Sequence, residues 1–174
     1  MRLFKGFILA IIGLFIMITL LSLLIPSKVV VTRGVAVNGN ARKVFAEIDN
    51  LHNWQHWQPV FKTDSPKMNF SPDSTGINSF CEWENRGKKN KLLITAISEY
   101  EITVALSGEG ESDVMNILTI LPLPDSNSVQ VEWRAITKLK WYPWEKLYGI
   151  FIEKATGQGY EDALNSLKTY VEGH

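Results

Sequence analysis

Two histidines, His52 and His56, stand four residues apart. On a helix this spacing places both imidazoles on one side, as some zinc sites require. The glutamate that follows the first histidine in metalloprotease helices is missing, because Asn53 stands there, and no third ligand is evident. We therefore expect no metal site. A histidine acting as a general base remains an alternative to polar surface or helix-cap positions.

Glu82 and Glu84 form a second candidate pair, since two carboxylates can divide the roles of acid and base. They alternate with Cys81 and Trp83, so a strand puts the glutamates on one face and the other two side chains on the opposite face. We expect the glutamates to face water and Cys81 to be buried and inert. As the only cysteine, Cys81 also excludes an intrachain disulfide and a cysteine-based zinc site.

Six tryptophans are the clearest compositional excess of the chain. Trp54 and Trp57 are three residues apart, and Trp83 and Trp133 lie in strand-like segments on faces expected to point inward. Such rings can form large, rigid apolar walls around a lipid-like or polycyclic ligand. The alternative is that they pack the core and cover helix ends.

The remaining two tryptophans, Trp141 and Trp144, bracket Pro143 ahead of the last predicted helix. Tryptophan and tyrosine gather where a protein meets the boundary between membrane and water. This short segment therefore has a further interpretation, as an aromatic anchor at the surface of a membrane.

The first 25 residues are the most distinctive segment. A short basic start is followed by an uncharged apolar run, residues 6–25, which ends at Pro26. About 20 helical residues span about 30 Å, the thickness of the hydrocarbon core of a bilayer. The hydroxyls of Thr19 and Ser22 can bond to carbonyls of the same helix. We therefore predict one membrane-spanning helix, with residues 1–26 as an anchor.

Two other interpretations of this run remain open: a cleaved signal peptide and a core helix of a soluble protein. A signal peptide would have a shorter apolar core and an A-x-A-like cleavage site, and no such site follows the run. Arg2 and Lys5 precede the run and Lys28 and Arg33 follow it, so the charge bias is nearly balanced. Because a short basic start more often stays in the cytoplasm, we expect a single-pass protein of the cell membrane with an extracytoplasmic domain.

Residues 27–174 are a normal length for one domain with one core. The chain has 18 basic and 18 acidic side chains. Removing the anchor takes away Arg2 and Lys5, which leaves 16 against 18, a formal charge of −2 with histidines neutral. Such a domain has no basic footprint for nucleic acid.

Beyond the anchor, β-branched residues at 28–37 predict a strand, and Asn40 is a plausible N-cap for a helix to about residue 50. Pro59 disfavours helix at Gln58, so any helix in the aromatic stretch ends by then. Further strands are predicted at 77–84, 91–98, 101–106, 114–121 and 128–137. Turn residues separate them, at 85–87, 108–110 and 122–127.

Within the last strand, Val129, Val131, Trp133 and Ala135 alternate with polar Gln130, Glu132 and Arg134. This period of two indicates an antiparallel strand with one face on a core and one in water. A long final helix is predicted over 143–172. Its expected apolar stripe is Leu147, Ile150, Phe151, Lys154, Ala155, Tyr160, Ala163, Leu164, Leu167 and Val171.

Gly157 and Gly159 lie in the middle of this helix, where each costs about 1 kcal/mol relative to alanine. They indicate a bend or a close approach to the sheet. A strand, a helix, a run of strands and a long closing helix together predict an α+β fold, with an antiparallel sheet wrapped around the final helix.

Four blocks of the chain carry a family resemblance. They are Val35-Ala36-Val37-Asn38 continuing into Ala41–Ile48, the pattern Asp49-x-x-x-Asn53-Trp54-x-x-Trp57-x-Pro59, Gly76 leading to Trp83-Glu84-Asn85, and the end of the final helix at residues 160–168. These blocks resemble the polyketide-cyclase-like group of the START-like (SRPBCC) helix-grip superfamily, in its membrane-anchored bacterial members. The resemblance covers nearly all of residues 29–171.

The resemblance implies an apolar cavity between a curved sheet and the long helix. It implies function weakly, because this superfamily hosts cyclases, lipid carriers and many other proteins. We expect a membrane-anchored domain that binds a hydrophobic small molecule or lipid, with no cofactor and no chemistry of its own. The expected ligand-binding residues are Trp54, Trp57, Phe61, Trp83, Trp133, Tyr148 and Phe151.

Two alternatives stay open. One is a cyclase- or hydratase-like enzyme, for which His56, Asn116 or Arg134 would be the first candidates if they face the cavity. The other is a tethered protein-interaction module whose cavity is filled by its own core, a hypothesis that an exposed apolar patch would favour.

Overall fold

The structure is a computed structural model that describes residues 2–63, 67–85, 87–124 and 127–174. The predicted turns at 85–87 and 122–127 include residues 86 and 125–126, which lie outside the described residues. Its elements are α1 (Arg2–Ser22), β1 (Lys28–Asn38), α2 (Ala41–Asp49), α3 (Trp54–Trp57), α4 (Pro59–Thr63), β2 (Met68–Phe70), β3 (Phe80–Asn85), β4 (Lys88–Ile97), β5 (Glu101–Gly108), β6 (Val114–Pro122), β7 (Ser128–Lys138) and α5 (Pro143–Gly173). This order confirms the predicted α+β class.

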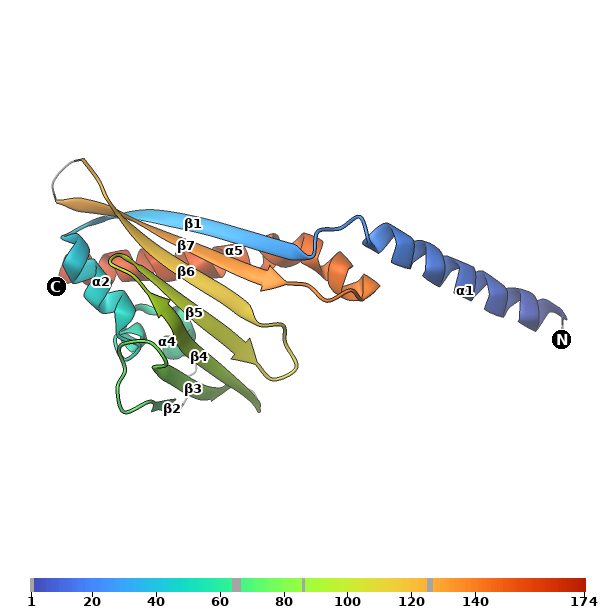
Figure 1. Cartoon of the computed structure of the whole chain (residues 1–174), viewed down its shortest axis with the longest axis horizontal. Helices are drawn as coiled ribbons and strands as arrows, with labels where there is room; N and C mark the ends of the chain where they lie inside the picture. Colours follow the sequence, from blue (N-terminus) through green and yellow to red (C-terminus); the bar gives the residue numbers. More distant parts are fainter. Residues whose placement is uncertain (1, 64–66, 86, 125–126) are drawn as a thin grey trace.

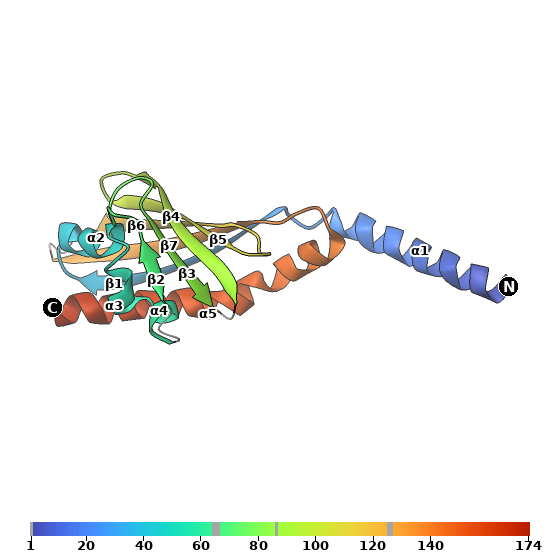
Figure 2. The ribbon, with the colours of Figure 1, turned by 90° about the horizontal axis from the view of Figure 1, so that it is seen from below.

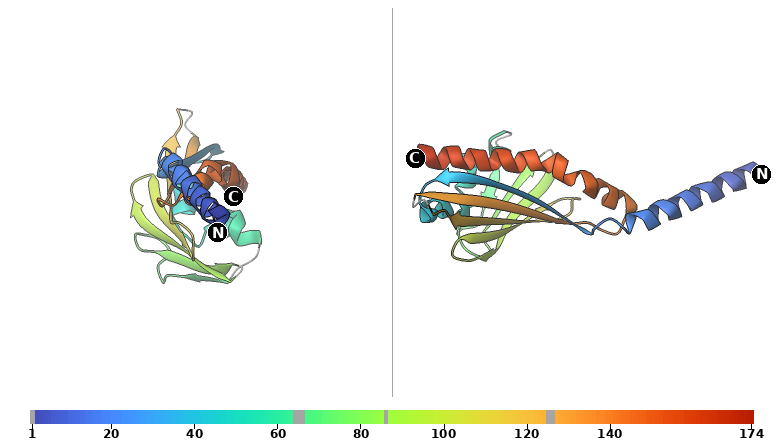
Figure 3. Two further views of the ribbon diagram at one scale, coloured as in Figure 1. Left: turned by 90° about the vertical axis from the view of Figure 1, so that its right-hand side faces the viewer. Right: turned by 90° about the horizontal axis from the view of Figure 1, so that it is seen from above.

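One seven-stranded sheet carries the domain, in the order β1-β7-β6-β5-β4-β3-β2 with every neighbouring pair antiparallel. The sheet curves around α5, as Figure 1 and the end-on view of Figure 3 show. In β4 the register shifts between Ile94 and Ala96, and such bulges bend a strand and increase its twist. The core lies between the concave face of the sheet and α5.

Strand parity decides which side chains enter this core. Val129, Val131, Trp133 and Ala135 of β7 are all buried, as their alternation predicted. Leu118 and Ile120 of the neighbouring strand β6 are buried on the same face. The alternating side chains of β7 are only partly buried, so the outer face of the sheet carries the polar residues.

The second half of α5 packs as predicted, with Ala163, Leu164, Leu167 and Val171 buried. The expected stripe is wrong for the first half. Leu147, Ile150, Phe151, Lys154 and Ala155 are exposed there, and the buried positions are Pro143, Lys146, Gly149 and Ile152. The first half is apolar on more than one side, so helical spacing alone did not identify the side that faces the protein.

The α5 helix changes direction along its length, so that its orange first part is inclined to the red remainder (Figure 2). Gly157 makes the expected close approach, because a Cβ there would collide with the guanidinium group of Arg33 on β1. Gly149 is also tightly placed, since a Cβ would meet the side chain of Leu139. A Cβ at Gly159, by contrast, would meet nothing within 4 Å.

Local signals account for the segment between β1 and β3. The side chain of Asn40 caps α2 by accepting a hydrogen bond from the backbone N–H of Arg42 at 2.8 Å. The α3 helix ends at Trp57, and α4 begins at Pro59, where the missing N–H of proline costs nothing. Strand β3 begins at Phe80, three residues later than predicted, because Asn78 adopts a φ of 73°.

The apolar helix α1 projects from the domain at the end where α5 begins (Figures 1 and 2). Its stretch Phe4–Ser22 has a mean hydropathy of 2.5 and, apart from Ser22 at its end, is not buried within the protein. The Thr19 hydroxyl donates to the carbonyl of Phe15 at 2.8 Å, and the Ser22 hydroxyl donates to the carbonyl of Thr19 at 2.7 Å, so both are satisfied within the helix. By length and composition, α1 suits either a membrane span or a signal sequence.

Candidate functional site

A cavity of about 280 Å³ lies between the concave face of the sheet and α5. Strands, the α3–α4 segment and α5 all contribute to it. Its lining consists of Trp83, Leu92, Leu106, Asn116 and Trp133 from the sheet, Trp54, Gln58, Val60 and Phe61 from the α3–α4 segment, and Ala155, Thr156, Gly159 and Tyr160 from α5. Val60, Ala155 and Gly159 are also exposed, and they mark the mouth of the cavity between α4 and α5.

The two tryptophans of α3 are held by the end of α2. The indole N–H of Trp54 donates to the carbonyl of Ile48 at 2.8 Å, and that of Trp57 donates to the carbonyl of Glu47 at 3.1 Å. Both carbonyls belong to the last turn of α2, where a helix leaves its C=O groups without partners. The rings are thus fixed in place, Trp54 in the cavity wall and Trp57 fully buried beside it.

A hydrogen bond orients Trp133, the central ring of the site. Its indole N–H donates to Oδ1 of Asn116 at 3.0 Å, and both residues are buried. In the register of β6 and β7, Trp133 lies opposite Leu118, so Asn116 is its diagonal neighbour on the same face. Because an indole can only donate, the oxygen of the Asn116 amide must face it, and the amide nitrogen remains for a bond to the carbonyl of Val114 and for a ligand.

Aromatic rings continue this wall on both sides. The Trp133 ring lies 5.9 Å from Trp54 and 5.2 Å from Tyr160 between centroids. Across the cavity, Phe61 meets Trp83 edge to face at 5.1 Å. Burial raises the pKa of the Tyr160 hydroxyl, so it stays a neutral hydrogen-bonding group at physiological pH. The site is a largely aromatic pocket whose lining also contains the polar side chains of Gln58, Asn116, Thr156 and Tyr160.

The structure brings together four of the seven residues expected to bind a ligand: Trp54, Phe61, Trp83 and Trp133 line the cavity. Trp57 packs against Trp54 and Trp133, at 5.0 and 6.2 Å between ring centroids, without lining the cavity. Tyr148 and Phe151 lie outside it, with exposed fractions of 58% and 60%. Their place in the first half of α5 turns them away from the core.

The two histidines have separate surroundings, both exposed. His52 stacks on Phe70 with 3.9 Å between ring centroids. His56 stacks on Tyr170 at 5.4 Å, and its Nδ1 lies 3.3 Å from the Tyr170 hydroxyl. Neither histidine lines the cavity. Within the described residues, no group of three or more histidine, cysteine or acidic side chains is placed to hold a metal ion.

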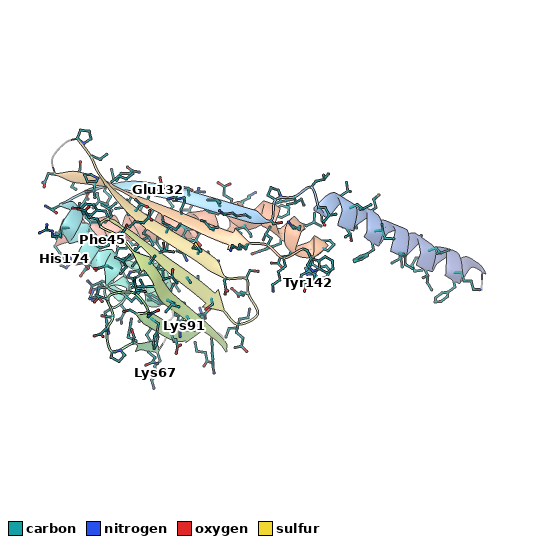
Figure 4. The ribbon with its side chains drawn as sticks, in the orientation of Figure 1. Phe45, Lys67, Lys91, Glu132, Tyr142 and His174 are labelled. Atoms are coloured by element: carbon teal, nitrogen blue, oxygen red, sulfur yellow. The ribbon has the colours of Figure 1, made fainter. Side chains whose placement is uncertain are left out.

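The remaining candidates face away from the cavity or are inert. Glu82 pairs with Lys91 across β3 and β4 at 2.8 Å on the outer face, where Figure 4 labels Lys91. Arg134 pairs with Glu132 at 3.4 Å on the outer face of β7. Cys81 is fully buried, and burial, with a smaller effect of the neighbouring Glu82 charge, raises the pKa of its thiol to about 12. A thiol of that kind is a poor nucleophile.

Several lining residues were not predicted as ligand-binding residues. Leu92 and Leu106 sit opposite each other in the register of β4 and β5, and Tyr160 was predicted only as part of the helical stripe. Strand parity could have put the two leucines on the inner face with Trp83. Their position beside a cavity, however, depends on how far α5 stands from that part of the sheet.

Three solved structures illustrate the likeness of this fold to known proteins. A START superfamily protein from Mycobacterium smegmatis shares 18% sequence identity, with a TM-score of 0.63 over 83% of this chain and 98% of that one. Norcoclaurine synthase from Thalictrum flavum, in complex with dopamine and hydroxybenzaldehyde, shares 13% identity, with a TM-score of 0.63 over 84% and 88% of the two chains. A protein from Nitrosospira multiformis shares 17% identity, with a TM-score of 0.61 over 80% and 94%.

By sequence, no family model matches the chain, and no curated protein is significantly similar to it. At these identities the structural likeness shows the fold. The chain has the helix-grip fold of START-like proteins, with an antiparallel sheet around a long carboxy-terminal helix. This confirms the predicted fold class, and the function must be argued from the site itself.

Proposed function

We propose that this protein binds a hydrophobic small molecule or lipid in the cavity between the sheet and α5. The observation that carries the proposal is the cavity wall, in which aromatic and aliphatic side chains line about 280 Å³ and a few polar groups, Asn116 and Tyr160 among them, are available to orient a ligand. Small-molecule sites typically combine an apolar lining with a few placed polar groups.

The size of the cavity narrows the ligand class. Small-molecule pockets occupy about 300–1,000 Å³, and this cavity of about 280 Å³ is just below that range. It suits a compact apolar molecule, or one chain or ring of a larger lipid whose remainder leaves through the mouth beside Val60 and Gly159. The glycine at position 159 supports an open mouth, because it has no side chain and the space next to it is empty.

In this proposal α1 is an uncleaved membrane anchor and residues 27–174 form the binding domain. The exposed apolar surface of Phe4–Ser22 supports anchoring, since such a surface is unfavourable in water. The short basic start favours a cytoplasmic amino terminus, which places the domain on the extracytoplasmic side of the cell membrane. Reporter fusions after residue 174 test this topology directly.

The alternatives draw less support from the site. Of the three side chains considered for an enzyme, only Asn116 lines the cavity, and an amide has no proton to transfer near neutral pH. A filled core would leave no room for a ligand, whereas this core encloses a cavity. An exposed apolar patch, which an interaction module would need, is present on the first half of α5, and a contact with the membrane is proposed for it below.

Photo-crosslinking of the full chain tests the binding proposal. The chain would be reconstituted in lipid nanodiscs that contain a fatty acid with a diazirine in its acyl chain, and labelled peptides would be mapped by mass spectrometry. We expect label on the peptides of β4 and β5 that carry Leu92 and Leu106. Label confined to α1 and the outer face of α5 would refute binding in the cavity.

Gly159 provides a matched pair of variants. Gly159→Phe places a ring in the mouth and should reduce the label on β4 and β5 several-fold, because the entrance is narrowed. Gly159→Ala adds only a methyl group in open space and should label like the wild type. Equal labelling of the two variants would show that the ligand does not enter beside Gly159.

A further inference from the structure

The exposed side of α5 changes character along the helix. In the first half the exposed side chains include Trp144, Tyr148 and Phe151, with exposed fractions of 62%, 58% and 60%. From residue 161 onward the exposed positions are polar, as at Glu161 and Asn165. A helix face in water is normally polar, and an exposed apolar patch usually marks a contact surface. The first half of α5 therefore presents an apolar surface that the second half lacks.

The apolar residues form a continuous line. Trp144, Tyr148, Phe151 and Ala155, here called the α5 stripe, follow one another at spacings of four, three and four residues, which puts them on one side of the helix. The stripe is about 16 Å long at about 1.5 Å per residue. It ends at Ala155, which also lines the cavity at its mouth.

The stripe begins where the apolar helix α1 ends. The buried ammonium group of Lys146 donates to the carbonyl of Ile25 at 3.0 Å and to the hydroxyl of Ser27 at 2.5 Å. The backbone N–H of Leu139 also donates to the carbonyl of Ser27, at 2.8 Å. These bonds tie the exit of α1 to the start of α5. Figure 4 labels Tyr142 at this end of the domain, and its ring stacks on that of Trp144 with 5.0 Å between centroids.

Three lysines lie at the same end, in a surface hollow that Glu111 and Asp113 also line. Lys28 of β1 lies directly opposite Lys138 of β7 in the sheet register, and Lys140 follows; all three are exposed. Like charges in this position repel each other. Among the residues that the structure describes, neither Lys28 nor Lys138 takes part in an ion pair. An external anion would remove the repulsion.

We propose that the α5 stripe lies on the surface of the bilayer that α1 enters, with Lys28, Lys138 and Lys140 close to anionic phospholipid headgroups. Lysine side chains are attracted to an anionic membrane surface, and tryptophan and tyrosine favour the interface. The inference rests on the anchoring by α1 proposed above. This pose requires a turn at residues 23–27, because α1 continues the long axis of the domain in Figures 1 and 2. After that turn the mouth beside Ala155 adjoins the bilayer, so a lipid can enter the cavity from the membrane without crossing water.

Spin-label accessibility of the full chain in nanodiscs with an anionic phospholipid tests the surface. Single cysteines would be introduced as Tyr148→Cys and Phe151→Cys on the stripe, with Glu161→Cys on the polar half and Ile12→Cys in α1 as controls. The native Cys81 does not interfere because it is fully buried. Collisions with oxygen report lipid, and collisions with a water-soluble nickel complex report water.

We expect the labels on the stripe and in α1 to collide with oxygen, and the label at 161 to collide with nickel. A stripe in water with α1 in lipid would overturn the surface and leave the anchor intact. If α1 itself is in water, the proposed anchoring fails and the surface with it. Dipolar broadening between stripe labels would assign the stripe to a second copy of the chain and overturn the proposal.

A charge variant gives an independent measurement that leaves the stripe unchanged. Lys138→Glu combined with Lys140→Glu reverses two exposed charges outside the core. The variant should lower the oxygen collision rate of the label at 148 in anionic nanodiscs and have little effect in uncharged nanodiscs. Equal effects in both membranes would rule out the contact between the lysines and the headgroups.

Discussion

Asn116→Ala tests whether the hydrogen bond at the centre of the cavity wall is as important as its burial indicates. Asn116 and Trp133 have exposed fractions of 2% and 3%, and the indole nitrogen lies 3.0 Å from the amide oxygen. Removing the oxygen leaves a buried N–H without an acceptor, at a cost of about 1–3 kcal/mol in the free energy of unfolding. For a domain of this size the melting temperature should fall by about 2–12 °C.

A double-mutant cycle separates the hydrogen bond from the loss of packing. Trp133→Phe removes the donor, and in the double variant neither partner remains, so nothing is left unpaired. We expect the double variant to be at least about 1 kcal/mol more stable than the sum of the two single losses. As a control, Asn165→Ala on the exposed side of α5 should change stability by about 0.5 kcal/mol or less.

Thermal unfolding of the full chain in detergent, followed by circular dichroism of the sheet, measures the wild type and the four variants without relying on tryptophan fluorescence. Additive losses in the cycle would refute the reasoning, because additivity means that the two side chains do not interact. A loss below about 0.5 kcal/mol for Asn116→Ala would refute it as well, since a buried N–H cannot lose its acceptor at so low a cost.

Three further outcomes can be measured on the same protein. Gly149→Ala should lower stability by about 1–3 kcal/mol in thermal unfolding because the added methyl meets Leu139, whereas Gly159→Ala should raise it by up to about 1 kcal/mol because it gains helix propensity in open space. The pKa of Cys81 is raised in the folded protein to about 12 from an ordinary value of 9.0. Its contribution to stability is therefore complete below pH 9 and is lost as the pH rises toward 12, by up to about 1.4 kcal/mol per pH unit. Cys81→Ala should make the free energy of unfolding less dependent on pH in that range. Lys146→Met removes the donor that ties α5 to the end of α1, and amide exchange at Leu139 should become faster while exchange in β6 stays unchanged.

Local patterns predicted the elements well where one periodicity dominates. The alternation in β7 placed Trp133 on the inner face, and the side chain of Asn40 caps α2 as its position suggested. Each of these features depends on residues a few positions apart. The late start of β3 was missed because the backbone at Asn78 adopts a positive φ that no apolar pattern reveals. Strand β2, Met68–Phe70, was missed because three residues are too few to show an alternation.

The candidate site shows where such patterns stop being informative. Tyr148 and Phe151 have the residue types of a cavity wall, yet both lie outside it, since the first half of α5 is apolar on more than one side. Asn116 looks like an ordinary strand residue until the register of β6 and β7 brings it to Trp133. The partner of a side chain across a sheet depends on register, which is a property of two strands together.

The sequence by itself determined the apolar helix α1, the α+β succession and the inward faces of the strands, because periodicity and hydropathy act along the chain. Only the tertiary structure decided which of these faces encloses a cavity. Gly157 and Gly159 illustrate the difference, since one is closed off by Arg33 and the other opens on the mouth of the cavity. The two residues are chemically identical, and their roles differ because space inside a protein depends on the distance between packed elements.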